Sequence, residues 1–249
     1  MPDDTATDQP QVNEIEVRGL LVGVFQENCW VVGNKRTKEA ICIDPGDQAD
    51  DIVHMAAEMG VTIKIIANSH AHLDHILGVR GVQSATGAKF LLHRDDEEIA
   101  RGAQESARRF GMEAEPVPDP DLWVDDGTKV EVDGLSLHTL HTPGHTRGSV
   151  CYYTDELLFS GDTLFAGSIG RTDLPGGDYQ QEMTSIVEKL LKLPDDTIVL
   201  PGHMQQTTIR NERQMNPFVV QELRDRGMLA PGDPDGTPGG SGLVLPSDF

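Results

Sequence analysis

The chain has 249 residues, with 41 acidic and 20 basic side chains, a formal charge of −21 at pH 7 and 37% hydrophobic residues. This length and apolar content suit one globular domain with a layered core. The negative charge repels phosphate backbones and anionic lipids. We therefore expect neither nucleic acid nor a membrane surface as a partner.

The N-terminal residues 1–13 are polar and without periodicity, so we expect a disordered leader before a single domain at 14–226. They contain no apolar run of the kind that marks a secretory signal. No stretch of the sequence approaches the roughly 18 apolar residues of a transmembrane helix, so a cytoplasmic location is the default expectation. The three cysteines form no C-x-x-C pair, and two of them, Cys29 and Cys42, lie in apolar runs typical of buried thiols.

The first half of the chain alternates between strand and helix patterns. Apolar runs, alternating or continuous, predict strands at residues 14–23, 29–33, 40–44, 61–67 and 89–93. Apolar residues at helical spacing predict helices at 49–60, from Ile76 to Val82, and at 95–111.

The second half repeats this organisation. Its patterns predict antiparallel strands within 128–144, a hairpin at 149–162, a helix at 179–193, a buried strand at 197–203 and at most two helices within 208–227, broken at Pro217. Residues 227–249 are rich in glycine and proline, which predicts a flexible tail. Strands followed by helices, twice over, predict an α/β fold with two packed mixed sheets and helices outside, a four-layered αββα sandwich.

The segment 68–78, NSHAHLDHILG, carries four potential metal ligands: His70, His72, Asp74 and His75. A polar surface turn is the simpler reading. In an extended chain, however, residues i and i+2 point to one side, so His70 and His72 can bind the same ion. Asp74 and His75 fall where the next helix begins and can face a second ion.

Three further candidates, His145, Asp162 and His203, each follow an apolar strand at a tight turn. A Pro-Gly or Ser-Gly pair supplies the turn directly before each of them. Since strand ends at one sheet edge lie close in space, these residues can converge with the first cluster. The resulting five imidazoles and two carboxylates suit Zn²⁺, Fe²⁺ or Mn²⁺, and Asp162 is the natural bridge between two ions.

The motifs SHAHLDH, TPGHTRGS, SGDTLF and PGH, in this order, resemble the metallo-β-lactamase superfamily over roughly residues 14–220. The resemblance implies the αββα fold and two adjacent divalent metals, with zinc as the expected metal and iron or manganese as alternatives. One metal would be held by His70, His72 and His145, the other by Asp74, His75 and His203, with Asp162 between them. One of His138 and His141, on the strand before His145, could orient a ligand.

Residues 160–178 and 201–218 look like the short glyoxalase II-like hydrolases, which implies cleavage of a glutathione thioester such as lactoylglutathione. Two cations sharing a water lower its pKa to roughly 7, which would supply hydroxide to attack the thioester carbonyl. Asp74 is placed to orient this nucleophile. By the same resemblance, Arg171 would bind a substrate carboxylate, with a structural ion pair to a nearby acid as the alternative role.

Two departures from the larger glyoxalase II enzymes concern the thiol carrier. Asp173 stands where those enzymes carry an aromatic residue, and little of the chain follows His203 to form their C-terminal glutathione site. Persulfide dioxygenases, which use one iron held by two histidines and an aspartate, are the main alternative. A lactone or other ester hydrolase of the same superfamily is the second, and a non-catalytic scaffold is the third.

Overall fold

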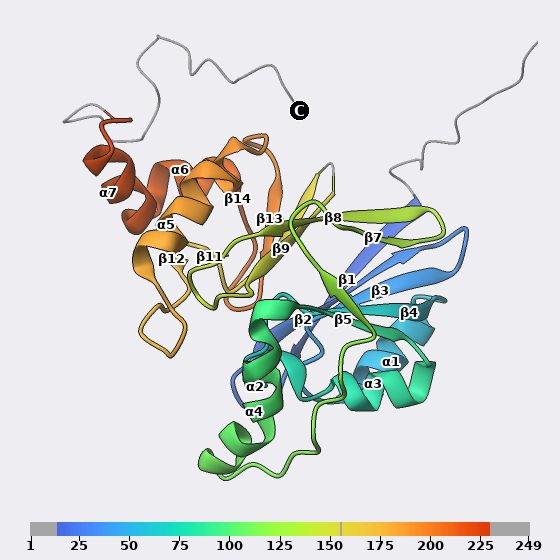
Figure 1. Cartoon of the computed structure of the whole chain (residues 1–249). Coiled ribbons are helices and arrows are strands. Elements are labelled where there is room, and N and C mark those ends of the chain that lie inside the picture. Colours follow the sequence, from blue (N-terminus) through green and yellow to red (C-terminus); the bar gives the residue numbers. More distant parts are fainter. Residues whose placement is uncertain (1–13, 155, 230–249) are drawn as a thin grey trace, which may run out of the picture.

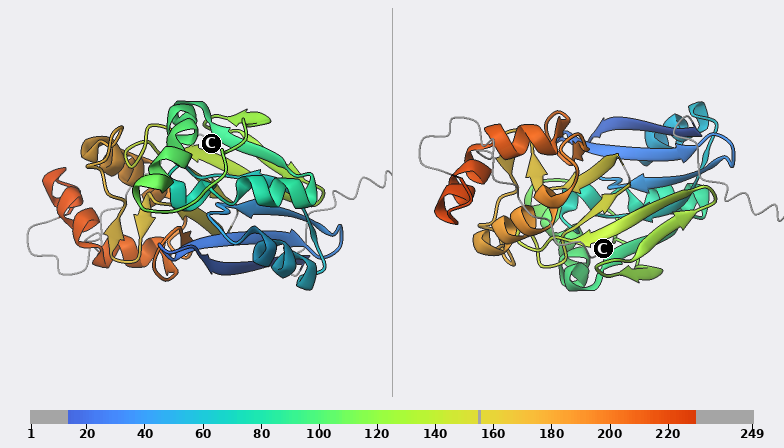
Figure 2. Two further views of the ribbon diagram at one scale, coloured as in Figure 1. Left: turned by 90° about the horizontal axis from the view of Figure 1, so that it is seen from below. Right: turned by 90° about the horizontal axis from the view of Figure 1, so that it is seen from above.

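The computed structural model describes residues 14–154 and 156–229, which form two mixed β-sheets packed face to face with helices outside (Figures 1 and 2). This arrangement confirms the predicted αββα sandwich. The expected leader, residues 1–13, and residues 230–249 of the expected tail lie outside the described residues. The last described residue, Leu229, is buried in an apolar cluster, three residues beyond the expected domain boundary.

The first sheet consists of the first six strands in chain order, namely β1 (Ile15–Val22), β2 (Glu27–Asn34), β3 (Glu39–Ile43), β4 (Thr62–Ala67), β5 (Lys89–His93) and β6 (Leu122–Val124). Strands β1 to β3 pair antiparallel, whereas β3 to β6 pair in parallel. The apolar strand β4 lies between β3 and β5, and its C-terminal end leads directly into the histidine-rich segment.

The second sheet has the strand order β14-β13-β10-β9-β8-β7, with bounds β7 (Lys129–Val132), β8 (Leu135–His141), β9 (Val150–Tyr153), β10 (Leu157–Gly161), β13 (Ile198–Pro201) and β14 (Thr207–Thr208). Only the β10–β13 pair is parallel within the described part of this sheet. Strands β11 (Leu164–Phe165) and β12 (Ser168–Ile169) form a separate small hairpin.

The helices fall into two groups on the outer sides of the sandwich (Figure 1). The first group is α1 (Ala49–Glu58), α2 (Leu73–Ile76), α3 (Val79–Thr86) and α4 (Glu97–Arg109), the last preceded by the 3₁₀ turn η2 (Arg94–Asp96). The second group is α5 (Tyr179–Glu188), the 3₁₀ turn η3 (Leu190–Lys192), α6 (Ile209–Met215) and α7 (Pro217–Asp225). None of the helices described is long and apolar enough to cross a membrane.

Three apolar clusters hold these layers together. The central one joins the facing sides of the two sheets, for example Ile41 and Ile43 of the first sheet with Tyr152 and Phe159 of the second, all nearly inaccessible to solvent. The other two lie between each sheet and its helices. Because both faces of each sheet are covered, the central strands read as continuous apolar runs.

The single helix predicted from Ile76 to Val82 is wrong, because Leu77 and Gly78 separate α2 from α3. The Gly78 amide donates to the Pro45 carbonyl at 2.9 Å, and a Cβ at this position would lie only 2.6 Å from that oxygen. The Gly78 amide is thus bonded outside the helix, which interrupts the helical hydrogen bonds between α2 and α3. The predicted break at Pro217 is confirmed, since Asn216 caps α7 and Pro217 occupies its first turn.

Candidate metal centre

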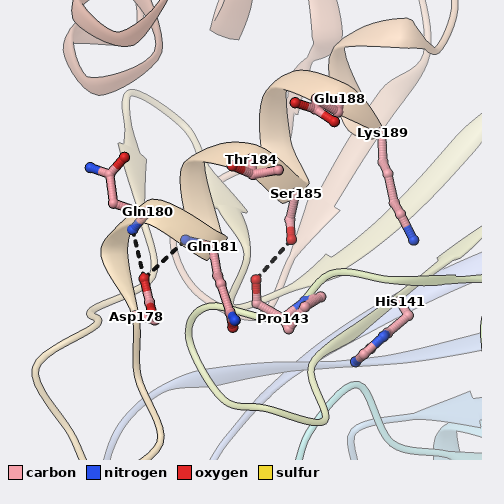
Figure 3. A pocket seen from close by; sticks show the side chains of 9 residues that line it. All are labelled: His141, Pro143, Asp178, Gln180, Gln181, Thr184, Ser185, Glu188 and Lys189. Atoms are coloured by element: carbon pink, nitrogen blue, oxygen red, sulfur yellow. Dashed lines mark hydrogen bonds between the residues drawn. The ribbon is translucent and has the colours of Figure 1, made fainter.

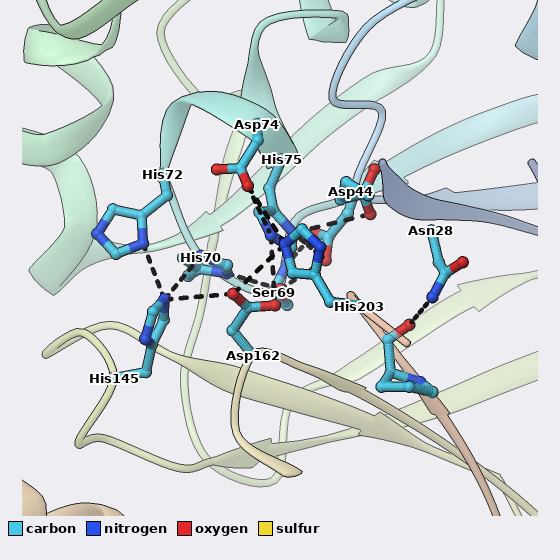
Figure 4. Close-up of polar contacts among 12 residues, drawn as sticks. Asn28, Asp44, Ser69, His70, His72, Asp74, His75, His145, Asp162 and His203 are labelled. Carbon is cyan, nitrogen blue, oxygen red and sulfur yellow. Dashed lines mark hydrogen bonds and ion pairs between the residues drawn. The ribbon is translucent and has the colours of Figure 1, made fainter. Parts of the chain in front are cut away.

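The seven predicted ligands come together at the ends of strands from both sheets (Figure 4). Four of them follow β4: His70 and His72 lie in the connecting turn, and Asp74 and His75 lie in α2. The second sheet contributes the three others, which follow β8, β10 and β13 and are His145, Asp162 and His203. The expected convergence therefore takes place across the sandwich rather than along one sheet.

Three histidines form the first group of donors. The His145 Nε2 atom lies 2.8 Å from His72 Nδ1 and 3.2 Å from His70 Nε2. The three rings are almost perpendicular to one another, with interplanar angles of 89°, 82° and 85°. Their nitrogens thus face one point, as three ligands of a tetrahedral ion must.

The second group contains Asp74, His75 and His203. The Asp74 Oδ2 atom lies 3.2 Å from His203 Nε2 and 3.9 Å from His75 Nε2. Asp162 stands between the two groups: its Oδ1 is 3.4 Å from His75 Nε2, and its Oδ2 is 3.6 Å from His145 Nε2 and 3.7 Å from His203 Nε2. Its carboxylate can therefore reach an ion in either group.

Two buried atoms at the centre have no hydrogen-bond partner, His75 Nε2 and Asp162 Oδ1. Buried polar atoms are nearly always satisfied by a hydrogen bond or an ion. A cation between the two would satisfy both. Together with the nitrogen and carboxylate donors around them, these atoms fit a pair of divalent metal ions.

The ring nitrogens that face away from the centre also have partners. The Nδ1 atoms of His75 and His145 lie 3.1 Å from Asp44 Oδ2 and 2.7 Å from the Arg171 carbonyl. Each acceptor holds a proton on Nδ1, so the Nε2 lone pair points into the centre. Ser69 completes this support, since its amide and hydroxyl both donate to Asp44 at 2.6 Å.

The protonation states of the first group and of Asp162 also suit metal binding. Burial lowers the pKa of His70 well below its usual value and that of His72 to about 4, so both rings are neutral at pH 7. Burial alone would raise the pKa of Asp162, but the neighbouring His75 and His145 lower it well below the usual range. Neutral imidazole and ionised carboxylate are the forms that bind metal.

Sequence reasoning missed several buried residues that support the centre. Asp44 carried a usable signal, because it directly follows the apolar strand β3, although its Pro-Gly pair comes after the aspartate rather than before it. Glu182 accepts a hydrogen bond from the His145 amide at 2.8 Å, and Glu27 Oε1 lies 3.7 Å from His75 Nδ1. Neither glutamate follows a recognisable motif, so only the fold reveals them.

Arg171 adjoins the centre in a way that the sequence did not predict. Its guanidinium is held by Asp173 in a bidentate pair, with both N···O distances at 2.8 Å, and its side chain is 61% exposed. Its contact with the centre is made by the backbone carbonyl that receives the His145 ring. The ion pair considered as the alternative role is present, and carboxylate binding by this side chain stays a prediction.

A cavity of about 400 Å³ lies behind the segment that carries His145, against α5 (Figure 3). Its wall includes His141, Pro143 and Ser185, and the Ser185 hydroxyl donates to the Pro143 carbonyl at 2.8 Å. None of the seven candidate ligands lines it. His141 Nε2 also lies 2.9 Å from the Arg147 carbonyl, so this histidine contacts the turn after His145.

Similar proteins show the family to which the chain belongs. Residues 22–203 match the metallo-beta-lactamase superfamily. The hydroxyacylglutathione hydrolase GloC of Haemophilus influenzae is 36% identical over 202 residues, which cover 80% of this chain and 95% of that protein.

Solved structures of similar chains share the fold. The BLEG-1 B3 metallo-beta-lactamase has a TM-score of 0.77 at 35% identity, covering 82% of this chain and all of that one. TTHA1623 in a di-iron-bound form has a TM-score of 0.73 at 34% identity, and the match covers 81% of this chain and 99% of that one. ETHE1 from Myxococcus xanthus has a TM-score of 0.72 at 27% identity, and the match covers 86% of this chain and 92% of that one. The family match, the αββα sandwich and the converging donors all agree. The chain belongs to the metallo-β-lactamase superfamily and is one of its metallo-hydrolases.

Proposed function

We propose that this metallo-hydrolase is a thioesterase of the glyoxalase II type, with a small glutathione thioester such as lactoylglutathione as its substrate. The observation that carries the proposal is the complete set of seven donors in two groups that share Asp162. The similarity to a hydroxyacylglutathione hydrolase over most of both chains supports the choice of a thioester over other hydrolysable bonds.

In this proposal one ion would be held by His70, His72 and His145 and the other by Asp74, His75 and His203, and the Asp162 carboxylate would serve both. Zinc fits the imidazole-rich first group best, and iron is the alternative that the di-iron form of a similar protein supports. When bound, such ions make water acidic enough to supply a nucleophile at neutral pH and polarise a carbonyl oxygen.

The protein's own residues orient the attacking water and the ligand rings. Asp74 is partly exposed, unlike buried His75, so its carboxylate can accept a hydrogen bond from an attacking water and orient it toward the thioester carbon. Asp44 and the Arg171 carbonyl keep the ligand rings in one tautomer throughout. The leaving thiolate needs little acid assistance, because a thiol is a much stronger acid than an alcohol and its anion leaves readily.

Recognition of the carrier is assigned to Arg171. For its guanidinium to bind a substrate carboxylate, it must exchange the Asp173 carboxylate for that of the substrate. Both side chains are exposed, so such an exchange requires no rearrangement of the core. A bidentate contact would then be formed in place of the one that is lost.

One set of assays tests the proposal against its rivals. The purified chain is analysed for metal content and then supplied with lactoylglutathione, with glutathione persulfide under oxygen, with a lactone and with a chromogenic β-lactam. We expect about two metals per chain and rapid release of glutathione from the thioester. Oxygen consumption with persulfide and a single iron per chain would replace the thioesterase with a dioxygenase. Preferential turnover of the lactone or the β-lactam would show that the substrate is not a thioester.

A further inference from the structure

Asp96 occupies the position from which a side chain usually caps a helix. It is the last residue of η2 and the N-cap residue of α4. An aspartate at this position normally accepts hydrogen bonds from the first amides of its own helix. The Asp96 side chain makes no such contact, and it is fully buried instead. Its carboxylate therefore serves another part of the fold.

The carboxylate joins two segments that are distant in sequence. Its Oδ2 accepts from the Ala71 amide at 2.9 Å and from the Thr146 hydroxyl at 2.8 Å, and its Oδ1 accepts from the Gly148 amide at 2.8 Å. Ala71 stands between His70 and His72, and Thr146 directly follows His145. One carboxylate thus connects the two backbone segments that carry the first group of donors.

The approach of the two segments to Asp96 is as close as the backbone allows. A Cβ at Gly148 would lie 2.7 Å from both Cγ and Oδ1 of Asp96, so a glycine is needed there. Thr146 and Ser149 add a further link, since their hydroxyls lie 2.8 Å apart. The turn after His145 is therefore built around this carboxylate.

We propose that Asp96 is a positioning residue for the metal site of His70, His72 and His145, fixing the spacing between the two segments that supply its ligands. This inference rests on the metal centre of the proposed function. Asp96 touches none of the three rings, so it acts through the backbone on either side of them. The site of Asp74, His75 and His203 receives no contact from Asp96 among the described hydrogen bonds, and it should be independent of it.

An amide cannot replace this carboxylate. Three donors converge on the two oxygens of Asp96, and all three are N–H or O–H groups that need an acceptor. In Asp96→Asn one oxygen becomes an NH₂ group, which turns a donor toward another donor whichever way the amide is oriented. The two segments should then move apart while the size of the side chain stays the same.

The test measures Zn²⁺ binding to the apoprotein by competition with a chelating indicator. We expect Asp96→Asn to weaken one of the two zinc equivalents by about ten- to a hundredfold, the range found when residues around metal ligands are changed, and to leave the other unchanged. Repeating the titration with His203→Ala as the background leaves the first site alone to be measured. In that background Asp96→Asn should weaken the remaining equivalent.

Glu212→Gln is the matched control. Glu212 is also buried, and its carboxylate also accepts three hydrogen bonds, from Thr207 at 2.6 Å and from Gly167 and Asn216 at 2.8 Å. None of these donors is adjacent to a proposed ligand. The control should lower thermal stability in the same manner without changing either zinc affinity.

The outcomes separate this inference from the function on which it rests. If Asp96→Asn keeps both affinities, or if Glu212→Gln weakens zinc binding equally, then Asp96 has only a general structural role and the inference is overturned. If the wild-type chain binds no zinc, the metal centre fails and the inference fails with it. Should Asp96→Asn not fold, Thr146→Val and Thr146→Ser replace it: valine, which removes one donor, should weaken the same equivalent, and serine, which keeps it, should not.

Discussion

Two clusters of three possible metal ligands differ in ring orientation, and of these two only His70, His72 and His145 are oriented as metal ligands. The other cluster is His93, Asp95 and His141. His70, His72 and His145 have rings at 82° to 89° to one another. His93 and His141 stack at 4.1 Å with an interplanar angle of 12°, and Asp95 lies close enough to offer a third donor atom. A cation in the plane of one stacked ring would lie outside the plane of the other, so these lone pairs do not meet.

The hydrogen bonds strengthen the contrast. In the stacked pair, His93 Nδ1 accepts from the Asp95 amide at 3.2 Å, which places the ring proton on Nε2. In the first group, the contact of His145 Nδ1 with a carbonyl frees Nε2 for an ion. Ligand chemistry is the same in both groups. What makes a site is the orientation of the lone pairs, which the surrounding backbone sets.

The largest effect should come from removing the bridge. Asp162→Ala takes away the one carboxylate that lies within 3.7 Å of three ligand histidines, so two cations would face each other without shared negative charge. We expect metal content to fall from about two per chain to one or fewer, and kcat/KM on the thioester to fall by roughly a hundredfold or more. Elemental analysis beside the assay measures both. A variant with two metals and full turnover would refute the ligand assignment.

A smaller loss of metal affinity is expected from changing Asp44, which contacts the ligand His75. Asp44→Asn weakens the acceptor that orients His75 and binds Ser69, so metal affinity should fall by about ten- to a hundredfold. Asp121→Asn is the control, because its exposed carboxylate also accepts two hydrogen bonds, from Gln83 and from the Phe90 amide, and neither donor is a proposed ligand. Equal losses in the two variants would mean that Asp44 has no specific role in metal binding.

The two metal sites should differ in their sensitivity to acid. Burial lowers the pKa of His70 well below its usual value and that of His72 to about 4, so protons compete little with metal at these two rings between pH 7 and 5. Burial also disfavours charge on His75 and His203, but the carboxylates of Asp74 and Asp162 outweigh it and raise their pKa values. Lowering the pH from 7 to 5 should therefore release the second metal first, because protons displace metal from rings of raised pKa. Metal content after dialysis at each pH measures this order, and simultaneous loss of both metals would contradict it.

A modest effect is expected for substrate binding. Arg171→Ala removes the guanidinium but keeps the carbonyl that holds His145, so kcat should be nearly unchanged while KM for lactoylglutathione rises about tenfold. Small neutral thioesters should be unaffected. Asp173→Ala, which frees Arg171 from its bidentate partner, should leave this KM equal or lower. Equal losses by Arg171→Ala on both kinds of substrate would assign the side chain a structural role.

The smallest effect is expected in the stacked pair. His93→Ala and His141→Ala should each leave metal content at about two per chain, since neither ring contributes a lone pair to a common point. His141→Ala removes a contact with the Arg147 carbonyl, and His93→Ala removes a buried ring that accepts from the Asp95 amide, so some loss of thermal stability is expected from both variants. A third metal equivalent in the wild type that disappears in either variant would show that the stacked rings rearrange to bind.

The sequence by itself determined the layered fold and the seven candidate ligands, because both follow from local rules. Apolar runs of strand or helix length define the layers, and each ligand stands where a buried strand meets a turn, as in the segments before His75 and before His203. Asp44 obeyed the same rule and could have been found. The distance between ligands in sequence did not matter, since each carried its own local signal.

Only the tertiary structure decided which residues support the ligands and which histidines are excluded from the centre. Asp96 looks like an ordinary helix cap in sequence, yet its carboxylate accepts from the Ala71 amide beside His72 and from the Thr146 hydroxyl beside His145. Arg171 approaches the centre through a carbonyl that every residue type possesses. His93 and His141 match the ligands in type but not in ring angle. These properties depend on directions between segments far apart in the chain, and local patterns carry no information about such directions.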